Sequence, residues 1–168
     1  QLRQSGIVAK VGENIETAAH TGSSTDDYKN HITGPNYSIQ GNILLGQEVL
    51  DGMEAGFLNA EGDLACKLMG ALQGANMVGA DMRCTNNGTS SLFAFVKVAQ
   101  PSDTFGDPSF LLSVRTGSND QIEPITELQS LFDTDRDCES LGLNQVDNDL
   151  PFSIYPNPSK NVVTLKVL

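Results

Sequence analysis

Five polar residues in three separate stretches of the chain could contact a ligand. Gln40 and Asn42 directly precede a predicted helix, whose first backbone N–H groups would favour a polar or anionic molecule. Asp81 and Arg83 alternate in a polar loop and could orient a polar substrate. Arg115 ends an apolar run, and its guanidinium could hold a carboxylate through two parallel hydrogen bonds. These five side chains are the predicted ligand-binding residues.

Each of these groups also has a purely structural interpretation. The first pair suits a turn, because asparagine tolerates unusual backbone angles and glutamine satisfies loop carbonyls. The second pair could form a salt bridge that clamps its own loop. Arg115 could cap a sheet edge or pair with Asp120. The residue types alone leave both interpretations open.

The residues that bind metals in proteins are too scattered here to predict a metal or cofactor site. His20 and His31 are isolated from each other and from any cysteine pair. Three alternating aspartates, 133 to 137, resemble part of a calcium loop, but Cys138 stands where that loop needs glycine. We therefore predict neither a metal nor a cofactor.

The chain has three cysteines, an odd number whose spacing matches no zinc-binding set. In an exported protein one disulfide is expected, and we predict it between Cys84 and Cys138. Cys66 lies in a predicted helix and is expected to be a small buried apolar group. Three unpaired thiols are the alternative.

The length and charge of the chain exclude some classes of protein. With 168 residues and 39% apolar residues, it can form one domain with a substantial core. The net charge of −11 argues against nucleic-acid binding, which needs clustered Lys and Arg. No apolar run is long enough to span a bilayer. The strand-like sequence at both ends predicts an internal fragment of a longer protein.

The first half of the chain is expected to form strands followed by two helices. We predict strands at 5–11, 15–20 and 37–39, a polar loop at 21–36, and a short resumed strand at 43–45. Apolar residues at helical spacing predict one helix at Val49, Leu50, Met53 and Phe57. A second helix, about 63–75, is expected to bury the stripe Leu64, Leu68, Ala71, Leu72 and Ala75.

The second half begins with a predicted loop at 76–90 and two apolar strands, 92–98 and 110–115. Their near-continuous apolar character predicts a sheet covered on both faces. A third helix starts at Pro124, with its core face at Ile125, Leu128, Leu131 and Phe132. Strands, two helices, strands and a helix in this order favour an α+β layered domain over residues 1–133. An acidic linker, 134–150, and a separate segment, 151–168, follow.

Three ordered stretches resemble the later part of domain-of-unknown-function family 1028, over roughly residues 4–132. They read YSIQGNILLGQEVLDGMEAGF, LACKLMGALQGANMVGADMRC and FLLSVRT followed by EPITELQSLF. The family is classed with the N-terminal-nucleophile (Ntn) hydrolases. The resemblance implies an αββα sandwich whose opening strands are missing. Ile7, Phe95 and Leu112 would then lie in adjoining strands beneath the helices of Val49 and Leu68.

In Ntn hydrolases the nucleophile is the first residue of the mature chain, a Thr, Ser or Cys that uses its own amino group as base. Gln1 is none of these, so the resemblance implies a nucleophile outside this sequence. Thr89 is the alternative, because Gly88-Thr89 before a strand is typical of an internally self-cleaving enzyme. The resemblance argues against it, since it places the nucleophilic end far upstream.

The final segment, FSIYPNPSKNVVTLKV, resembles the start of the type-A C-terminal sorting domain of the type IX secretion system. The resemblance implies contact with that machinery and a location outside a Gram-negative cell or on its surface. An ordinary proline turn between two edge strands is the alternative.

Together these observations predict an amide-bond hydrolase that acts on a small-molecule or peptide-like substrate. A non-catalytic binding or structural module and a cell-surface interaction protein are the alternatives. The sequence leaves the oligomeric state open, including a homo-oligomer.

Overall fold

The computed structural model describes residues 1–138, 152–155 and 164–167 of the chain. Its elements follow the order β1 (Gln4–Val11), β2 (Asn14–Thr21), β3 (Asn30–Thr33), β4 (Ser38–Gly41), α1 (Gln47–Asn59), α2 (Leu64–Gly74), the 3-10 helix η1 (Met82–Asn87), β5 (Phe93–Val98), β6 (Phe110–Arg115), α3 (Pro124–Asp135), β7 (Phe152–Tyr155) and β8 (Thr164–Val167). The described strands form two-stranded antiparallel pairs. The predicted α+β class is therefore confirmed.

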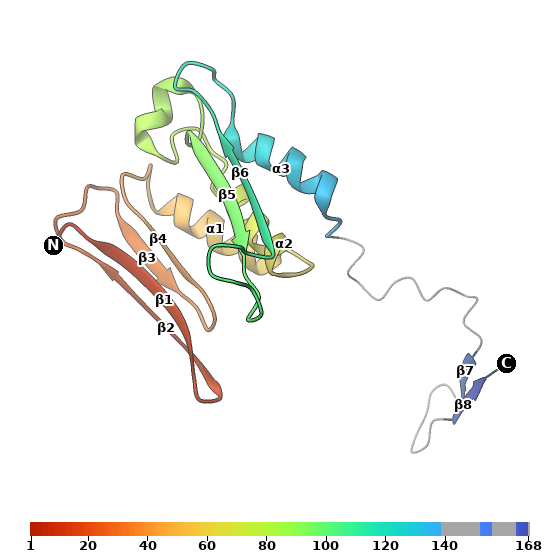
Figure 1. Cartoon of the computed structure of the whole chain (residues 1–168). Helices are drawn as coiled ribbons and strands as arrows, with labels where there is room; N and C mark the ends of the chain where they lie inside the picture. The colour runs from red at the N-terminus through yellow and green to blue at the C-terminus, as the bar shows by residue number, and fades with distance from the viewer. Residues whose placement is uncertain (139–151, 156–163, 168) are drawn as a thin grey trace.

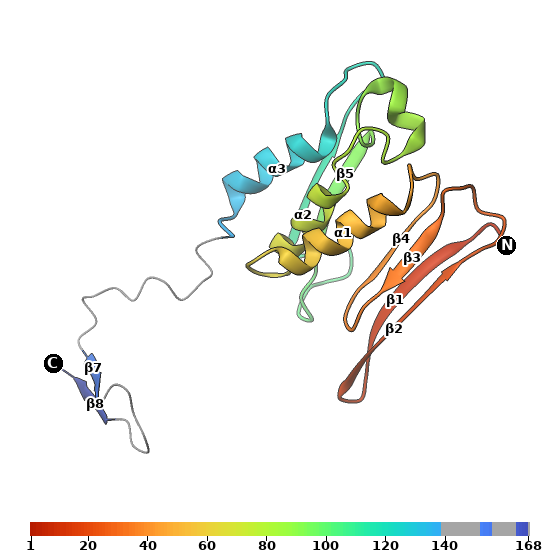
Figure 2. The same ribbon diagram turned by 180° about the vertical axis from the view of Figure 1, so that it is seen from behind.

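The helix pair α1 and α2 separates two groups of strands (Figures 1 and 2). Helix α1 contacts β3 and β4, whereas α2 contacts β5 and α3. Phe95 and Leu112 lie on the neighbouring strands β5 and β6, as expected. Ile7 lies in the separate β1–β2 hairpin, so the expectation that it adjoins Phe95 was wrong.

The first strands form two hairpins that side-chain hydrogen bonds tie together. β1 and β2 pair from Gln4 opposite Thr21 to Val11 opposite Asn14. The side-chain nitrogen Nε2 of Gln4 donates to the backbone carbonyls of Asn30 and Gly41, 3.0 and 2.9 Å away, which links β1 to β3 and β4. Strand β3 lies within the stretch predicted as a loop, because three of its four residues are polar and gave no strand signal there.

Helices α1 and α2 pack with their backbones in contact through glycines. Val49, Leu50 and Phe57 are buried on α1, as the sequence predicted. A Cβ added to Gly74 on α2 would lie 1.9 Å from the carbonyl oxygen of Gly52 on α1. Only glycine allows this close approach, so the helix pair depends on both residues.

The predicted buried face of α2 was only partly right. Asp63 caps the helix by accepting a hydrogen bond from the Cys66 N–H. Leu64 therefore occupies the first turn, where its side chain is 51% exposed. Cys66 and Met69 are buried instead, while Leu68 packs at the margin of the core. The apolar spacing predicted the helix correctly, but it did not predict which side of the helix faces the core.

The main core lies between the inner face of the β5–β6 hairpin and helices α2 and α3. Val96 on β5 and Leu128 on α3 are almost fully buried, and the ring of Phe110 meets that of Phe132 edge-on at 5.7 Å. On the opposite face, Phe95 is 51% exposed. The prediction of a sheet covered on both faces was therefore wrong for the described residues. Leu131, predicted for the core face of α3, is also largely exposed.

Residues 43–45 do not resume a strand. Ile43 has a φ of 56°, in the left-handed region that β-branched residues rarely adopt, so an extended run cannot pass through it. Leu44 instead forms an isolated antiparallel bridge with Asp81. This segment thus connects the end of β4 to the loop that carries the second pair of predicted site residues.

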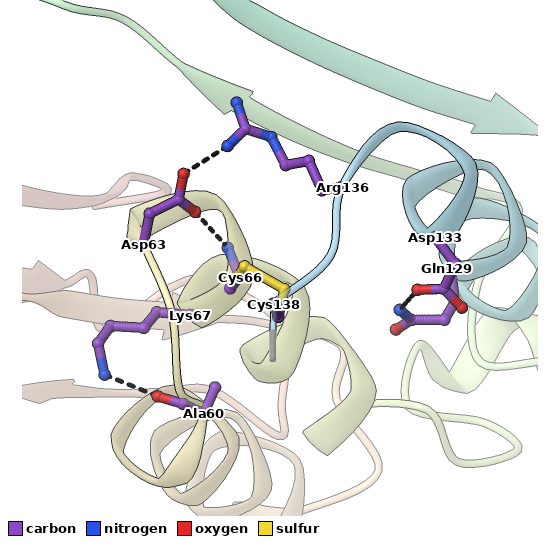
Figure 3. The surroundings of a disulfide bond; sticks show 8 residues. All are labelled: Ala60, Asp63, Cys66, Lys67, Gln129, Asp133, Arg136 and Cys138. Atoms are coloured by element: carbon purple, nitrogen blue, oxygen red, sulfur yellow. Dashed lines mark hydrogen bonds and ion pairs between the residues drawn. A yellow bond between two sulfur atoms is a disulfide. The ribbon is translucent and has the colours of Figure 1, made fainter. Parts of the chain in front are cut away.

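The disulfide joins Cys66 to Cys138, so the predicted Cys84–Cys138 pairing was wrong (Figure 3). Cys84 is a free, buried thiol in η1. The first turn of α2 lies beside the segment after α3, where Arg136 forms an ion pair with Asp63. Tertiary packing, which cysteine spacing does not reveal, selected the pair.

The predicted domain boundary at residue 133 falls inside α3, which ends at Asp135. The disulfide holds the chain to the domain as far as Cys138. Residues 139–150 of the predicted linker lie outside the described residues. Beyond it, β7 and β8 pair as an antiparallel hairpin. In the part of the chain that the structure describes, every helix is too short or too polar to cross a membrane.

Candidate functional site

Asp81 and Arg83 form a tightly bonded pair at the start of η1. The Asp81 carboxylate caps this helix by accepting from the backbone N–H of Arg83 at 3.0 Å. It also accepts from the Arg83 guanidinium, with Nε at 2.9 Å and Nη2 at 2.6 Å. These bonds to Arg83 lower the pKa of Asp81 below its ordinary value, against the opposing effect of burial. The Arg83 guanidinium is therefore already neutralised by its own loop.

Backbone hydrogen bonds hold this loop between two other segments. The N–H of Asp81 donates to the carbonyl of Ser90 at 2.8 Å, and the N–H of Met82 donates to that of Ile43 at 3.0 Å. These bonds fix the loop beside the turn that follows β4. The Gln40 side chain is exposed on β4, and the Asn42 side chain is exposed on the turn that follows. The side-chain oxygen of Gln40 accepts from the hydroxyl of Ser38 at 3.0 Å.

Glu123 fastens the same loop to α3, a role that the sequence analysis missed. Its carboxylate accepts from the backbone N–H and the hydroxyl of Ser90, both at 2.6 Å. It also caps α3 through the N–H of Ile125 at 3.0 Å. An acidic residue directly before Pro124 is a recognisable N-cap signal, but no local pattern connects it to Ser90.

The buried hydroxyl of Thr89 and the buried thiol of Cys84 are poorly placed for catalysis. Thr89 is 1% exposed, and its hydroxyl donates to the carbonyl of Ser91 at 2.9 Å while accepting from Asn87. Burial raises the pKa of the Cys84 thiol, and the Asp81 charge adds to this effect. The thiol therefore stays protonated at neutral pH, and Thr89 fits a structural role.

Two neighbouring surface depressions bring three of the five predicted residues together. One, of about 450 Å³, is lined by Asp81, Arg83, Cys84, Ser91, Leu92 and Phe93. The other, of about 610 Å³, is lined by Leu92, Phe93, Arg115, Thr116, Gly117 and Ser118. Because both contain Leu92 and Phe93, we treat them as one site and call it the twin depression. The side chains of Gln40 and Asn42 are absent from its described lining.

The Arg115 end of the twin depression holds polar groups without partners. The Arg115 guanidinium forms no ion pair or hydrogen bond with any described residue. The suggested partner, Asp120, instead accepts from the N–H of Gly117 at 2.9 Å. The hydroxyl of Thr116 is buried and likewise has no hydrogen-bond partner in the described structure. The exposed Arg115 guanidinium at this end can therefore donate hydrogen bonds to the oxygens of a ligand.

Nothing in the described residues assembles a metal site, since no three His, Cys, Asp or Glu side chains converge there. The twin depression combines an ion pair, a free guanidinium and an exposed aromatic ring. Such a surface can bind an organic molecule through charge and apolar contact together.

The fold and the site define a small α+β domain of antiparallel strand pairs and helices, with a polar, aromatic-walled depression at its surface. A model of the family of unknown function DUF1028 matches residues 1–128, so the chain belongs to the DUF1028 family. Among solved structures, it is similar to the crystal structure of a DUF1028 protein from Silicibacter pomeroyi, at 25% identity and a TM-score of 0.50. The match covers 70% of this chain and 46% of the other. No curated protein matches the chain.

Proposed function

We propose that this DUF1028 domain binds a small-molecule or peptide-like ligand in the twin depression. The observation that carries the proposal is the convergence of Asp81, Arg83 and Arg115 around the exposed ring of Phe93. These residues come from η1, β5 and β6, so the fold and not local sequence groups them.

The proposal can be tested by NMR screening of amino-acid derivatives and short peptides against the labelled chain. A specific ligand is expected to shift the amide signals of Leu92, Phe93 and Thr116. The signal of Ala18 serves as the control, because it lines a separate depression of about 390 Å³ on the β1–β2 hairpin. A screen without hits, or hits that shift Ala18 equally, would reject the proposal.

A second candidate function is amide-bond hydrolysis by the complete protein. In this case the Thr, Ser or Cys nucleophile would lie in polypeptide outside this sequence, in an Ntn-type αββα sandwich. Two observations favour it: the motif resemblance, and the fact that the match covers only 46% of the Silicibacter pomeroyi chain. The residues described here would then orient the substrate.

This candidate requires the longer protein for its test. The mature protein should begin with Thr, Ser or Cys, and replacing that residue by Ala should abolish amide hydrolysis. A mature terminus of another type, with no turnover of amide substrates that bind, would favour the non-catalytic binding module instead.

We further propose that the protein is exported to the cell surface or the medium of a Gram-negative bacterium. The Cys66–Cys138 disulfide supports this, because structural disulfides persist mainly in oxidising compartments. The resemblance of residues 152–167 to a type IX sorting tail is the second support. Deleting residues 151–168 should then retain the protein inside the cell, which fractionation would reveal. Export without any ligand for the twin depression would favour the cell-surface interaction protein.

A further inference from the structure

We propose that the Arg115 end of the twin depression recognises a carboxylate, and that the apolar body of the same ligand lies against Phe93. This inference depends on the proposed function, that the twin depression binds a ligand, and it specifies the chemical class of that ligand. The ligand class is a monocarboxylate with an aryl or branched alkyl group, such as an N-acylated amino acid.

The two guanidinium groups of the site differ in what they offer to a ligand. Arg83 already donates to Asp81 through Nε and Nη2, which neutralises its charge. Arg115 has no such partner among the described residues. A second anionic group on the ligand would meet the Asp81 carboxylate beside Arg83. One free cation and one internal ion pair therefore favour a ligand that carries a single negative charge.

The overall negative charge of the chain makes the unpaired Arg115 guanidinium important for the selectivity of the site. A chain with a net charge of −11 repels anions from most of its surface. Binding of an anion is therefore favoured where a cation stands without its own counter-ion. Lys97 is the other unpaired cation on this outward face, but it lies opposite Leu111, whereas Arg115 lies opposite Phe93. Of these two cations, only Arg115 lines the depression.

Arg115 supplies the directional part of the recognition by itself. The neighbouring N–H of Gly117 is already donated to Asp120, and the Thr116 hydroxyl is shielded from solvent, so neither is open to a ligand in the depression. The Arg115 guanidinium is exposed and can donate two parallel hydrogen bonds to the two oxygens of one carboxylate.

Phe93 supplies the apolar part of the recognition. Its side chain is 52% exposed and its ring centre lies 5.7 Å from that of Phe95, so aromatic surface continues along β5. Phe93 lines both halves of the twin depression. A ligand whose carboxylate meets Arg115 can therefore lay an apolar group over this ring without leaving the site.

The experiment compares N-acetyl-phenylalanine with N-acetyl-phenylalaninamide, two probes that share a body and differ in charge. Binding to the full 168-residue chain is measured by NMR titration. The acid is expected to bind about ten-fold more tightly than the amide, as for a charge-assisted hydrogen bond. Arg115→Gln should remove this preference. Lys97→Gln, which removes the same charge from the same face, should leave it unchanged.

The outcomes separate this inference from the proposed function. Equal binding of acid and amide, with shifts at Leu92 and Thr116, would overturn the carboxylate assignment and leave the ligand site in place. A loss of preference in Lys97→Gln as large as in Arg115→Gln would also overturn it, because general charge attraction would then explain the binding. Failure of both probes and of the wider screen to shift these signals would overturn both proposals.

Discussion

The two faces of the β5–β6 hairpin carry similar apolar residues in different environments. On the inner face, Val96 and Phe110 are 2% and 7% exposed, because α2 and α3 pack against them. On the outer face, Phe95 and Leu111 are 51% and 52% exposed. Residue type is thus nearly the same on both faces, and the cover supplied by helices is the difference. The comparison teaches that stability comes mainly from one face, while the other is free to contact a ligand.

Polar groups also differ between the inner and outer faces of the β5–β6 hairpin. The inner face joins a dry core in which the rings of Phe110 and Phe132 meet. The outer face ends at Arg115, whose charge is uncompensated in the described structure. A charge of this kind is tolerated only where water or a ligand can reach it. The outer face is consequently where recognition chemistry can occur.

The largest effect should come from removing an aromatic ring on the inner face. Phe110→Ala should lower the free energy of unfolding by about 3–5 kcal/mol, since it leaves a cavity and removes the contact with Phe132. The Arg136 guanidinium, 4.3 Å from the Phe110 ring centre, would lose that contact too. Urea unfolding would measure the change. A loss below 1 kcal/mol would mean that this face is not the stabilising one.

The disulfide should contribute the next largest amount, because it closes a loop across the inner core. The double change Cys66→Ala and Cys138→Ala should cost about 2–4 kcal/mol, as expected for a crosslink with a sequence separation of 72. Cys84→Ala, which removes a buried free thiol, is the matched control and should cost less. Non-reducing peptide mapping provides an independent check. Detection of a Cys84–Cys138 peptide would contradict the structure.

A smaller, pH-dependent effect is expected at the site itself. The folded state lowers the pKa of Asp81 below its ordinary value, so the Asp81–Arg83 pair stabilises the fold above about pH 4. This stabilisation should disappear as the pH falls through the lowered pKa. Asp81→Asn should therefore be less stable than the native chain at pH 7, and this difference should shrink as the pH falls through the lowered pKa.

Thermal unfolding across this pH range would measure the difference. Asp107→Asn is a suitable control, because Asp107 is exposed and its side chain has no ion pair in the described part of the chain. A deficit for Asp81→Asn that does not depend on pH would show that the ion pair is not its cause.

The smallest effect should come from the outer face. Phe95→Ala removes the same ring as Phe110→Ala but should cost less than about 1 kcal/mol, because the ring is half exposed already. The same urea titration provides the measurement. If the two variants lose equal stability, something covers the outer face in solution and the contrast between the faces fails.

The local sequence pattern was sufficient to predict most helices and strands but not which of their faces would be buried. The apolar spacing at Val49, Leu50 and Phe57 predicted α1 and its buried face, and Pro124 marked the start of α3. The face of α2 was misjudged at Leu64, because a helix terminus can leave an apolar residue in solvent. β3 was missed, since three of its four residues are polar and its pairing with β4 has no local sequence signature.

The candidate site was predicted only as separate residues. Asp81, Arg83 and Arg115 were identified by type, and the structure places all three along the twin depression. Gln40 lies on β4 and Asn42 on the turn after it, both exposed and outside the described lining of that depression. Glu123 escaped notice because its partner, Ser90, is distant in the sequence.

The sequence by itself determined the α+β class, the family, the positions of the three main helices and the residue types capable of binding an anion. These properties depend on local periodicity, capping and motif, which neighbouring residues encode. Tertiary structure alone decided that Cys66 pairs with Cys138, that α2 and α3 cover only one face of β5–β6, and that Arg115 lacks a partner while Arg83 has one. Each of these depends on which segments meet across long stretches of chain, and that is set by packing of the whole domain.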